Sequence, residues 1–134
     1  MTAALVIDAS AALRIVLKGE GGENYGHAAR AASLLLAPRL YCTEAANGLW
    51  RNVRAGFMSR PDALDKLNRI ILLVDRFEDD DRLASETLTL SIELGHPVYD
   101  LTYLVLARRN GAGLVTADRG LAELGAKLCL DVIH

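Results

Sequence analysis

The sequence has few of the residues that define several classes of protein. It contains two cysteines, Cys42 and Cys129, which lie far apart in apolar, strand-like runs, so we expect both to fill the core as small hydrophobic residues and not to form a disulfide framework. No uncharged apolar run reaches the roughly 18 residues that a membrane-spanning helix needs. No basic segment precedes the first apolar run, so we expect no signal peptide. These absences predict a soluble, cytoplasmic protein.

An excess of positive charge is also missing. The formal net charge is −2, so the overall electrostatic signature of a nucleic-acid-binding protein is absent. Any nucleic acid must then be held by a local basic patch or through a bound metal. The three histidines, His27, His96 and His134, are scattered and show no metal-ligand spacing. The chain of 134 residues, 51% of them apolar, suits one compact domain over residues 1–134.

Short apolar runs alternate with helical patterns along the chain. We expect strands at residues 4–8, 39–42, 77–81, 113–117 and 128–133, and helices at 10–19, 25–36, 44–57, 62–77, 83–94, 100–110 and 118–125. Most of the strand runs are continuously apolar and do not alternate with polar residues, which is typical of a parallel sheet covered on both faces. The predicted fold class is α/β.

The predicted helix at residues 44–57 has two distinct faces. At about 100° per residue, Glu44, Asn47, Arg51 and Arg54 share one face. The opposite face is apolar and consists of Ala46, Leu49, Trp50, Val53 and Phe57. We therefore expect Trp50 to pack in the core and Glu44 to point away from it. The later helix at 100–110 is apolar around nearly its whole circumference, Tyr103 included, and we expect it to be buried.

Four acidic residues fall at the predicted carboxyl ends of strands or at helix starts. Asp8 ends the first strand, Glu44 follows the "RLYC" run, Asp118 follows "GLVTA", and Asp100 begins the apolar helix. Ligands of open parallel sheets bind outside the carboxyl ends of the strands, where these positions meet. Each acid alone is also explained as a helix cap or a favourable charge at a helix N-terminus.

A cluster of carboxylates needs a cation. Two carboxylates about 4 Å apart repel by about 4 kcal/mol at an effective dielectric constant near 20. Carboxylate oxygens without histidine or thiolate partners suit Mg²⁺ or Mn²⁺ better than zinc. Such metals activate water and orient a phosphodiester, which indicates phosphodiester hydrolysis.

Other polar residues lie near the acids in sequence. Ser10 and Thr116 stand two residues from Asp8 and Asp118 and can bond a carboxylate, a metal-bound water or a phosphate, although Ser10 can equally cap a helix, as Thr43 can. Arginines at Arg51, Arg54, Arg108, Arg109 and Arg119 are candidates for a local phosphate-binding patch, with solvated helix faces as the alternative.

Four segments resemble, in order and spacing, the signature blocks of the PIN-domain nucleases, most closely the VapC-type toxins of prokaryotic toxin–antitoxin pairs. They are "VIDASAAL", "TEAANGLWR", "YDLTYLVLARRNG" and "LVTADRGL". The resemblance implies a three-layer α/β/α fold around a parallel sheet of about five strands, and a Mg²⁺- or Mn²⁺-dependent endoribonuclease acting through metal-activated water. Its acidic positions correspond to Asp8, Glu44, Asp100 and Asp118, and its neighbouring polar positions to Ser10, Asn47 and Thr116.

The resemblance also implies partners: an RNA substrate, a small antitoxin protein and a second copy of the chain in a homodimer. For RNA contacts we favour Arg51, Arg54 and Arg119. Two alternatives stay open. One is a catalytically inactive PIN-like module that works by binding a protein partner. The other, a phosphoacceptor domain, is disfavoured because Ala9 and Ser10, not a second acid, follow Asp8.

Overall fold

Five short strands form one parallel sheet in the computed structural model, which describes residues 3–134. The strands are β1 (Leu5–Ile7), β2 (Leu35–Pro38), β3 (Arg76–Glu78), β4 (Gly113–Val115) and β5 (Val132–Ile133). Their order in the sheet is β3-β2-β1-β4-β5, and each neighbouring pair is parallel. The predicted α/β class with a five-stranded parallel sheet is confirmed.

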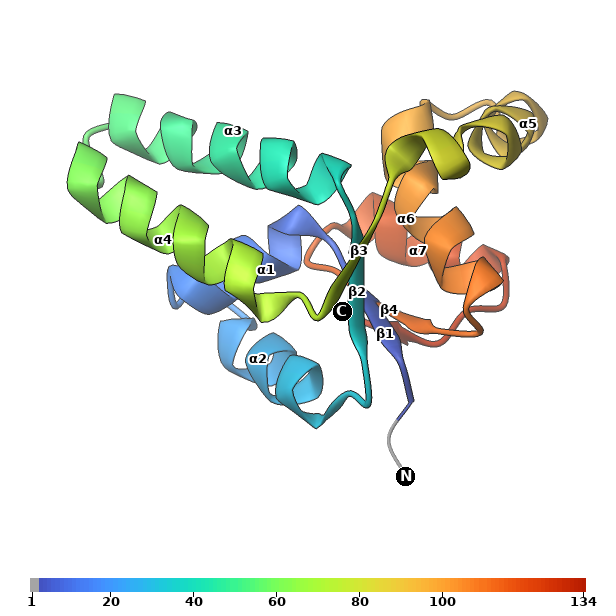
Figure 1. The fold of residues 1–134 in the computed structure, drawn as a ribbon, viewed down its shortest axis with the longest axis horizontal. Coiled ribbons are helices and arrows are strands. Elements are labelled where there is room, and N and C mark those ends of the chain that lie inside the picture. Colours follow the sequence, from blue (N-terminus) through green and yellow to red (C-terminus); the bar gives the residue numbers. More distant parts are fainter. Residues whose placement is uncertain (1–2) are drawn as a thin grey trace.

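Helices cover both faces of this sheet, as Figure 1 shows. One layer contains α1 (Ala9–Val16), α2 (Gly22–Ala31), α3 (Leu40–Arg54) and α4 (Arg60–Leu73), and the other contains α5 (Ala84–Leu94), α6 (Val98–Arg109) and α7 (Arg119–Lys127). A short 3₁₀ turn at Asp80–Arg82 joins β3 to α5. The predicted three-layer α/β/α arrangement is therefore present. In the described part of the chain, no helix is both long and apolar enough to cross a membrane.

The core lies between the sheet and the two helical layers. Val6, Leu36 and Leu114, in the three central strands, are almost completely buried. Helix α6 is buried from Leu101 to Ala107, as its uniformly apolar sequence predicts, and packs against β1, β2 and β4. Because Asp100 precedes this buried stretch, burial of α6 holds that carboxylate close to the sheet.

The second strand and the third helix differ from the sequence prediction. The run "LLAP" forms β2, whereas we expected it to continue a helix, and "RLYC" begins α3 instead of forming a strand. The leucines of this run satisfy helical propensity equally well, but in the fold Leu35 and Leu36 are buried in a strand between the two helical layers. Tyr41 is in the first turn of α3, fully buried, and its hydroxyl donates a hydrogen bond to the Ile70 carbonyl. Thr43 is consequently inside the helix and does not cap it.

The buried face of α3 is also rotated from the predicted one. Tyr41, Ala45, Gly48 and Leu49 face the core, whereas 53% of Trp50 and 79% of Phe57 are exposed. The prediction that Trp50 packs in the core is wrong. The cysteine predictions were also wrong in part, because Cys129 is exposed in a turn with φ of 62° and Cys42 is only partly buried in α3. The buried face of α3 thus combines two large side chains, Tyr41 and Leu49, with two small residues, Ala45 and Gly48.

Candidate active site

The candidate site lies where the chain leaves β1 and β4 at the carboxyl edge of the sheet. Asp8 follows β1 directly, and its backbone N–H donates to the Val115 carbonyl at the end of β4 over 3.1 Å. Asp8 has extended backbone angles and its carboxylate accepts a hydrogen bond from the Ala11 N–H over 2.9 Å, so Asp8, not Ser10, caps α1. Asp118 caps α7 in the same way.

A hydrogen-bond network joins the two strand ends through Asp8. The Ser10 and Thr116 hydroxyls donate to the Asp8 carboxylate over 2.7 and 2.6 Å. In turn, the Ser10 oxygen accepts from the Ala117 N–H over 3.0 Å, and the Thr116 oxygen accepts from the Asp118 N–H over 2.9 Å. Each hydroxyl thus receives one hydrogen bond from the segment after β4 and gives one to Asp8. The predicted neighbours Ser10 and Thr116 orient this buried carboxylate.

Glu44 and Asp100 approach the same edge from opposite helical layers. The Tyr103 hydroxyl, on α6, donates to the Glu44 carboxylate, on α3, over 2.5 Å. Asp100 lies one turn before Tyr103 on α6, and its carboxylate is 3.7 Å from the His96 imidazole. Tyr103 is buried, as we expected, but its contact with Glu44 was not foreseen. Because Tyr103 lies three residues after Asp100, both fall on the same face of a helix, and this spacing could have indicated that Tyr103 lies near the acids.

The four acids lie within one another's electrostatic reach. Burial raises the pKa of Asp8 to about 6, and the charge of Asp118 adds to that rise. Burial also raises the pKa of Glu44, opposed by the Tyr103 hydrogen bond and reinforced by the charges of Asp100 and Asp8. For Asp100, burial again raises the pKa most, followed by the charge of Asp118. The acids therefore share a negative field at one edge of the sheet.

The chemistry of these donors fits a hard divalent cation. The side chains that converge offer carboxylate and hydroxyl oxygens, which Mg²⁺ and Mn²⁺ prefer. Each raised carboxylate pKa reflects in part a neighbouring negative charge that a bound cation would offset. Between residues 3 and 134, no three His, Cys, Asp or Glu side chains stand close enough together to hold a metal ion as arranged.

The other candidate residues divide into two groups. Asn47 and Arg51 lie beside Glu44 on α3, and all three line one pocket of about 400 Å³. Arg54 is not among the residues that line this pocket, and its guanidinium lies 5.3 Å from the centre of the exposed Trp50 ring. Arg119 is exposed and 3.4 Å from Glu123. Of the three arginines favoured for RNA, only Arg51 lines a pocket shared with a candidate acid.

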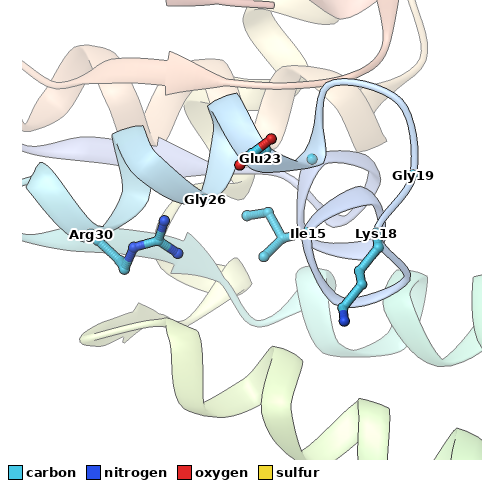
Figure 2. Close-up of a pocket in the computed structure, with 7 residues that line it drawn as sticks. Ile15, Lys18, Gly19, Glu23, Gly26 and Arg30 are labelled. Atoms are coloured by element: carbon cyan, nitrogen blue, oxygen red, sulfur yellow. The ribbon is translucent and has the colours of Figure 1, made fainter.

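A further pocket, also of about 400 Å³, lies beside the glycine-rich segment and is separate from the acids. Figure 2 shows it between the end of α1 and α2, with Ile15 and Gly26 facing each other and Arg30 at one side. It adjoins the C-terminal end of α1, about 12 Å from the N-terminal end that Asp8 caps, given the helical rise per residue. The pocket between α1 and α2 therefore lies apart from Asp8, Glu44, Asp100 and Asp118.

Comparisons with known proteins agree with this architecture. The family model of the PIN domain matches residues 5–127. Ribonuclease VapC3 of Pyrobaculum aerophilum is 32% identical over 124 residues, which cover 89% of this chain and 92% of that protein.

Solved structures show the same fold. PAE2754 from Pyrobaculum aerophilum superposes with a TM-score of 0.72 and 27% identity, over 90% of this chain and 78% of that one. VapBC2 from Rickettsia felis, solved bound to a DNA fragment from its promoter, gives a TM-score of 0.66 at 14% identity, over 97% of each chain. The chain therefore belongs to the PIN domain family and, within it, to the VapC-type proteins.

Proposed function

We propose that this chain is a Mg²⁺- or Mn²⁺-dependent endoribonuclease that acts as the toxin of a toxin–antitoxin pair. The position of four carboxylates from separate elements near one edge of the sheet carries the proposal. The charge of Asp118 raises the pKa of Asp8 and of Asp100, and the charges of Asp8 and Asp100 raise the pKa of Glu44. The match to the PIN domain model and the similarity to ribonuclease VapC3 support the same activity.

The residues have distinct roles in this proposal. Asp8, Asp100 and Asp118 hold the metal, and Glu44 holds a second ion or a water. A divalent ion bound there supplies Lewis acidity, lowers the pKa of water and stabilises the leaving oxygen of a phosphodiester. Ser10 and Thr116 fix the orientation of the Asp8 carboxylate through hydrogen bonds of 2.7 and 2.6 Å. Asn47 lies on the same pocket wall as Glu44 and assists it.

Tyr103 is an additional positioning residue. Its hydroxyl bonds one Glu44 oxygen and leaves the other free for a water or an ion. Because Tyr103 is almost completely buried in α6, it holds Glu44 at a defined place between the two helical layers. The partly buried carboxylate is thus held in one orientation at the wall of its pocket.

The proposed partners are single-stranded regions of RNA, a cognate antitoxin and a second copy of the chain. The presence of a VapB partner in the similar Rickettsia felis structure supports the antitoxin. A largely apolar groove of about 390 Å³ supports a protein partner as well, because Leu88 and Tyr99 on its wall are more than half exposed and their burial is favourable. This groove joins α5, α6 and the start of α3.

The test compares RNA cleavage by the wild type and by Asp100→Asn in Mn²⁺ and in EDTA. We expect the wild type to cleave only with the metal and Asp100→Asn to lose at least about a hundredfold in rate, the range for loss of a group acting in the transition state. Asp65→Asn on α4 is the matched control, since it removes an exposed acid that pairs with Arg69 on the same helix. Full activity in EDTA, or equal activity of Asp100→Asn, would reject the proposal.

A catalytically inactive PIN-like binding module is the second candidate. One observation favours it: in the part of the chain that the structure describes, no three potential ligands stand close enough to hold a metal as arranged. In that case Asp8 and Asp118 serve as the caps of α1 and α7, which they form in the structure. Metal-dependent stability separates the two candidates.

A further inference from the structure

A pocket of about 380 Å³ lies between α1 and α3, directly beside the acidic edge. Its lining residues are Ser10, Leu13, Arg14, Leu17, Gly19, Gly48, Arg51 and Asn52. Ser10 connects the pocket to the site, because its hydroxyl donates to the Asp8 carboxylate over 2.7 Å. A ligand in this pocket would therefore lie next to Asp8.

The pocket combines an apolar wall with polar and cationic groups. Leu13 and Leu17 are partly buried and form the apolar wall. The Asn52 amide nitrogen donates to the Gly48 carbonyl over 2.9 Å, which leaves the amide oxygen free to accept a hydrogen bond from a ligand. Arg14 and Arg51 place positive charge at the same pocket. An apolar surface, an amide acceptor and a guanidinium suit the base and the phosphate of one nucleotide.

Arg51 also lines the second pocket, the one that contains Glu44. That pocket has a volume of about 400 Å³ and includes Asn47 and Tyr99. The exposed Arg51 guanidinium thus stands where the two pockets meet, with Ser10 in one and Glu44 in the other. A strand that filled both pockets would pass Arg51 and the acidic edge together.

We propose that single-stranded RNA occupies both pockets, with one base in the pocket between α1 and α3 and Arg51 on the phosphate that links the two nucleotides. This inference rests on the proposed ribonuclease function and adds the substrate-binding residues. The charge favours RNA over a neutral peptide, because Arg14 and Arg51 both line this pocket and an anionic phosphate is attracted to them; one Arg14 nitrogen also donates a hydrogen bond to the Glu20 carbonyl over 2.9 Å. An unpaired base is required, since a base within a duplex is not available to enter a pocket.

The first test measures binding of a fluorescent single-stranded RNA oligonucleotide in Mn²⁺, in the Asp100→Asn background so that the RNA stays intact. Adding Arg51→Ala should weaken binding roughly tenfold, as expected for loss of one charge-assisted contact, and lower the slope of log affinity against log salt by about 0.7. Adding Arg69→Ala instead is the matched control, since Arg69 lies on α4 and pairs with Asp65. Equal effects of the two substitutions would overturn the proposal.

The second test addresses the base pocket. The Asp100→Asn protein should bind oligo(A), oligo(C) and oligo(U) with different affinities. Adding Asn52→Leu, which keeps the size of the side chain, should reduce those differences. Adding Asn68→Leu on α4 instead is the matched control and should leave them intact. Equal affinities for the three oligonucleotides, or affinity differences that Asn52→Leu does not reduce, would overturn the assignment of this pocket. Unchanged RNA binding by Arg51→Ala with weaker binding of polyglutamate would assign the pocket to an acidic peptide instead.

The tests separate this inference from the function on which it rests. If the wild type fails to cleave RNA in Mn²⁺, the ribonuclease proposal and this inference both fall. If the wild type cleaves RNA and Arg51→Ala matches Arg69→Ala in both binding and KM, only the inference falls. A higher KM for Arg51→Ala with kcat largely retained would support a role in substrate binding.

Discussion

Asp8 shows how a single buried residue is used for more than one purpose. It caps α1, accepts hydrogen bonds from Ser10 and Thr116, and is only 4% exposed. The hydrogen bonds favour its ionised form, but burial outweighs them and raises the pKa to about 6. The charged Asp8 is therefore costly to the metal-free fold and is suited to a role in which a cation is bound.

The stability of the metal-free protein should fall as Asp8 ionises. Its pKa is higher in the folded chain than the ordinary value of 3.8, so the contribution of the protonated form to stability is complete below pH 3.8 and is lost as pH rises through about 6. The shift corresponds to roughly 3 kcal/mol. Urea unfolding in EDTA from pH 4 to 8 should show this loss, and Asp8→Asn should remove most of it.

Glu44 and Asp100 add to the same trend, since burial raises the pKa of both. Asp65→Asn serves as the control for Asp8→Asn, because Asp65 is exposed on α4 and should leave the pH dependence as in the wild type. An Asp8→Asn protein whose stability falls with pH as steeply as the wild type would contradict the assignment of this effect to Asp8.

Among the elements, α1 and α2 depend on a close backbone approach at one glycine. A Cβ atom at Gly22, the first residue of α2, would lie 2.2 Å from the Arg14 carbonyl oxygen of α1. At Gly26, one turn later, a Cβ atom would lie 3.1 Å from the Arg30 guanidinium, which is the end of a flexible side chain, and 3.6 Å from an Ile15 methyl group, an ordinary contact. Packing thus requires glycine at position 22 of the glycine-rich segment but not at position 26.

Two alanine substitutions test this difference between otherwise similar sites. Gly22→Ala should lower the free energy of unfolding by about 1–3 kcal/mol, because a backbone oxygen cannot yield without a shift of the helices. Gly26→Ala should be neutral or should stabilise α2 by up to about 1 kcal/mol through helical propensity. Urea unfolding of both variants is the measurement. Equal effects at the two positions would show that α1 and α2 are not held by this contact.

Across the whole molecule, the acidic edge exists only because segments distant in sequence meet. Asp8 follows β1, Glu44 lies on α3, Asp100 on α6 and Asp118 caps α7. The sheet order places β1 between β2 and β4, so the chain segments that follow these three strands leave at neighbouring positions on one edge. Folding therefore concentrates negative charge that a divalent ion would offset.

Metal binding should stabilise the folded chain as a whole. At a Mn²⁺ concentration about 100 times the dissociation constant, the gain should be roughly 2.7 kcal/mol, seen as a higher melting temperature. Asp8→Asn should abolish most of this gain, whereas Asp65→Asn should retain it. A melting temperature that does not respond to millimolar Mn²⁺ would contradict the metal site and favour the binding-module alternative.

The structure places one of the predicted acids on an element that the sequence did not predict there. Glu44 was expected two residues after a strand, yet "RLYC" is helical and the strand is "LLAP". Glu44 still follows the carboxyl end of a strand, because α3 begins two residues after β2 ends. In contrast, the sequence did not predict the partners of two acids. Tyr103 is 59 residues from Glu44 and has the pattern of a core residue. His96 is only four residues from Asp100 but resembles an ordinary surface residue.

The sequence by itself determined the fold class, the order of strands and helices in the chain with the exception around β2, and the family. These follow from local apolar patterns and from short motifs, which do not depend on distant residues. Only the tertiary structure decided which face of α3 is buried, which hydroxyls hold Asp8 and how strongly the acids affect one another. These properties depend on burial and on contacts between segments distant in sequence, such as the contact of Thr116 with Asp8 across 108 residues.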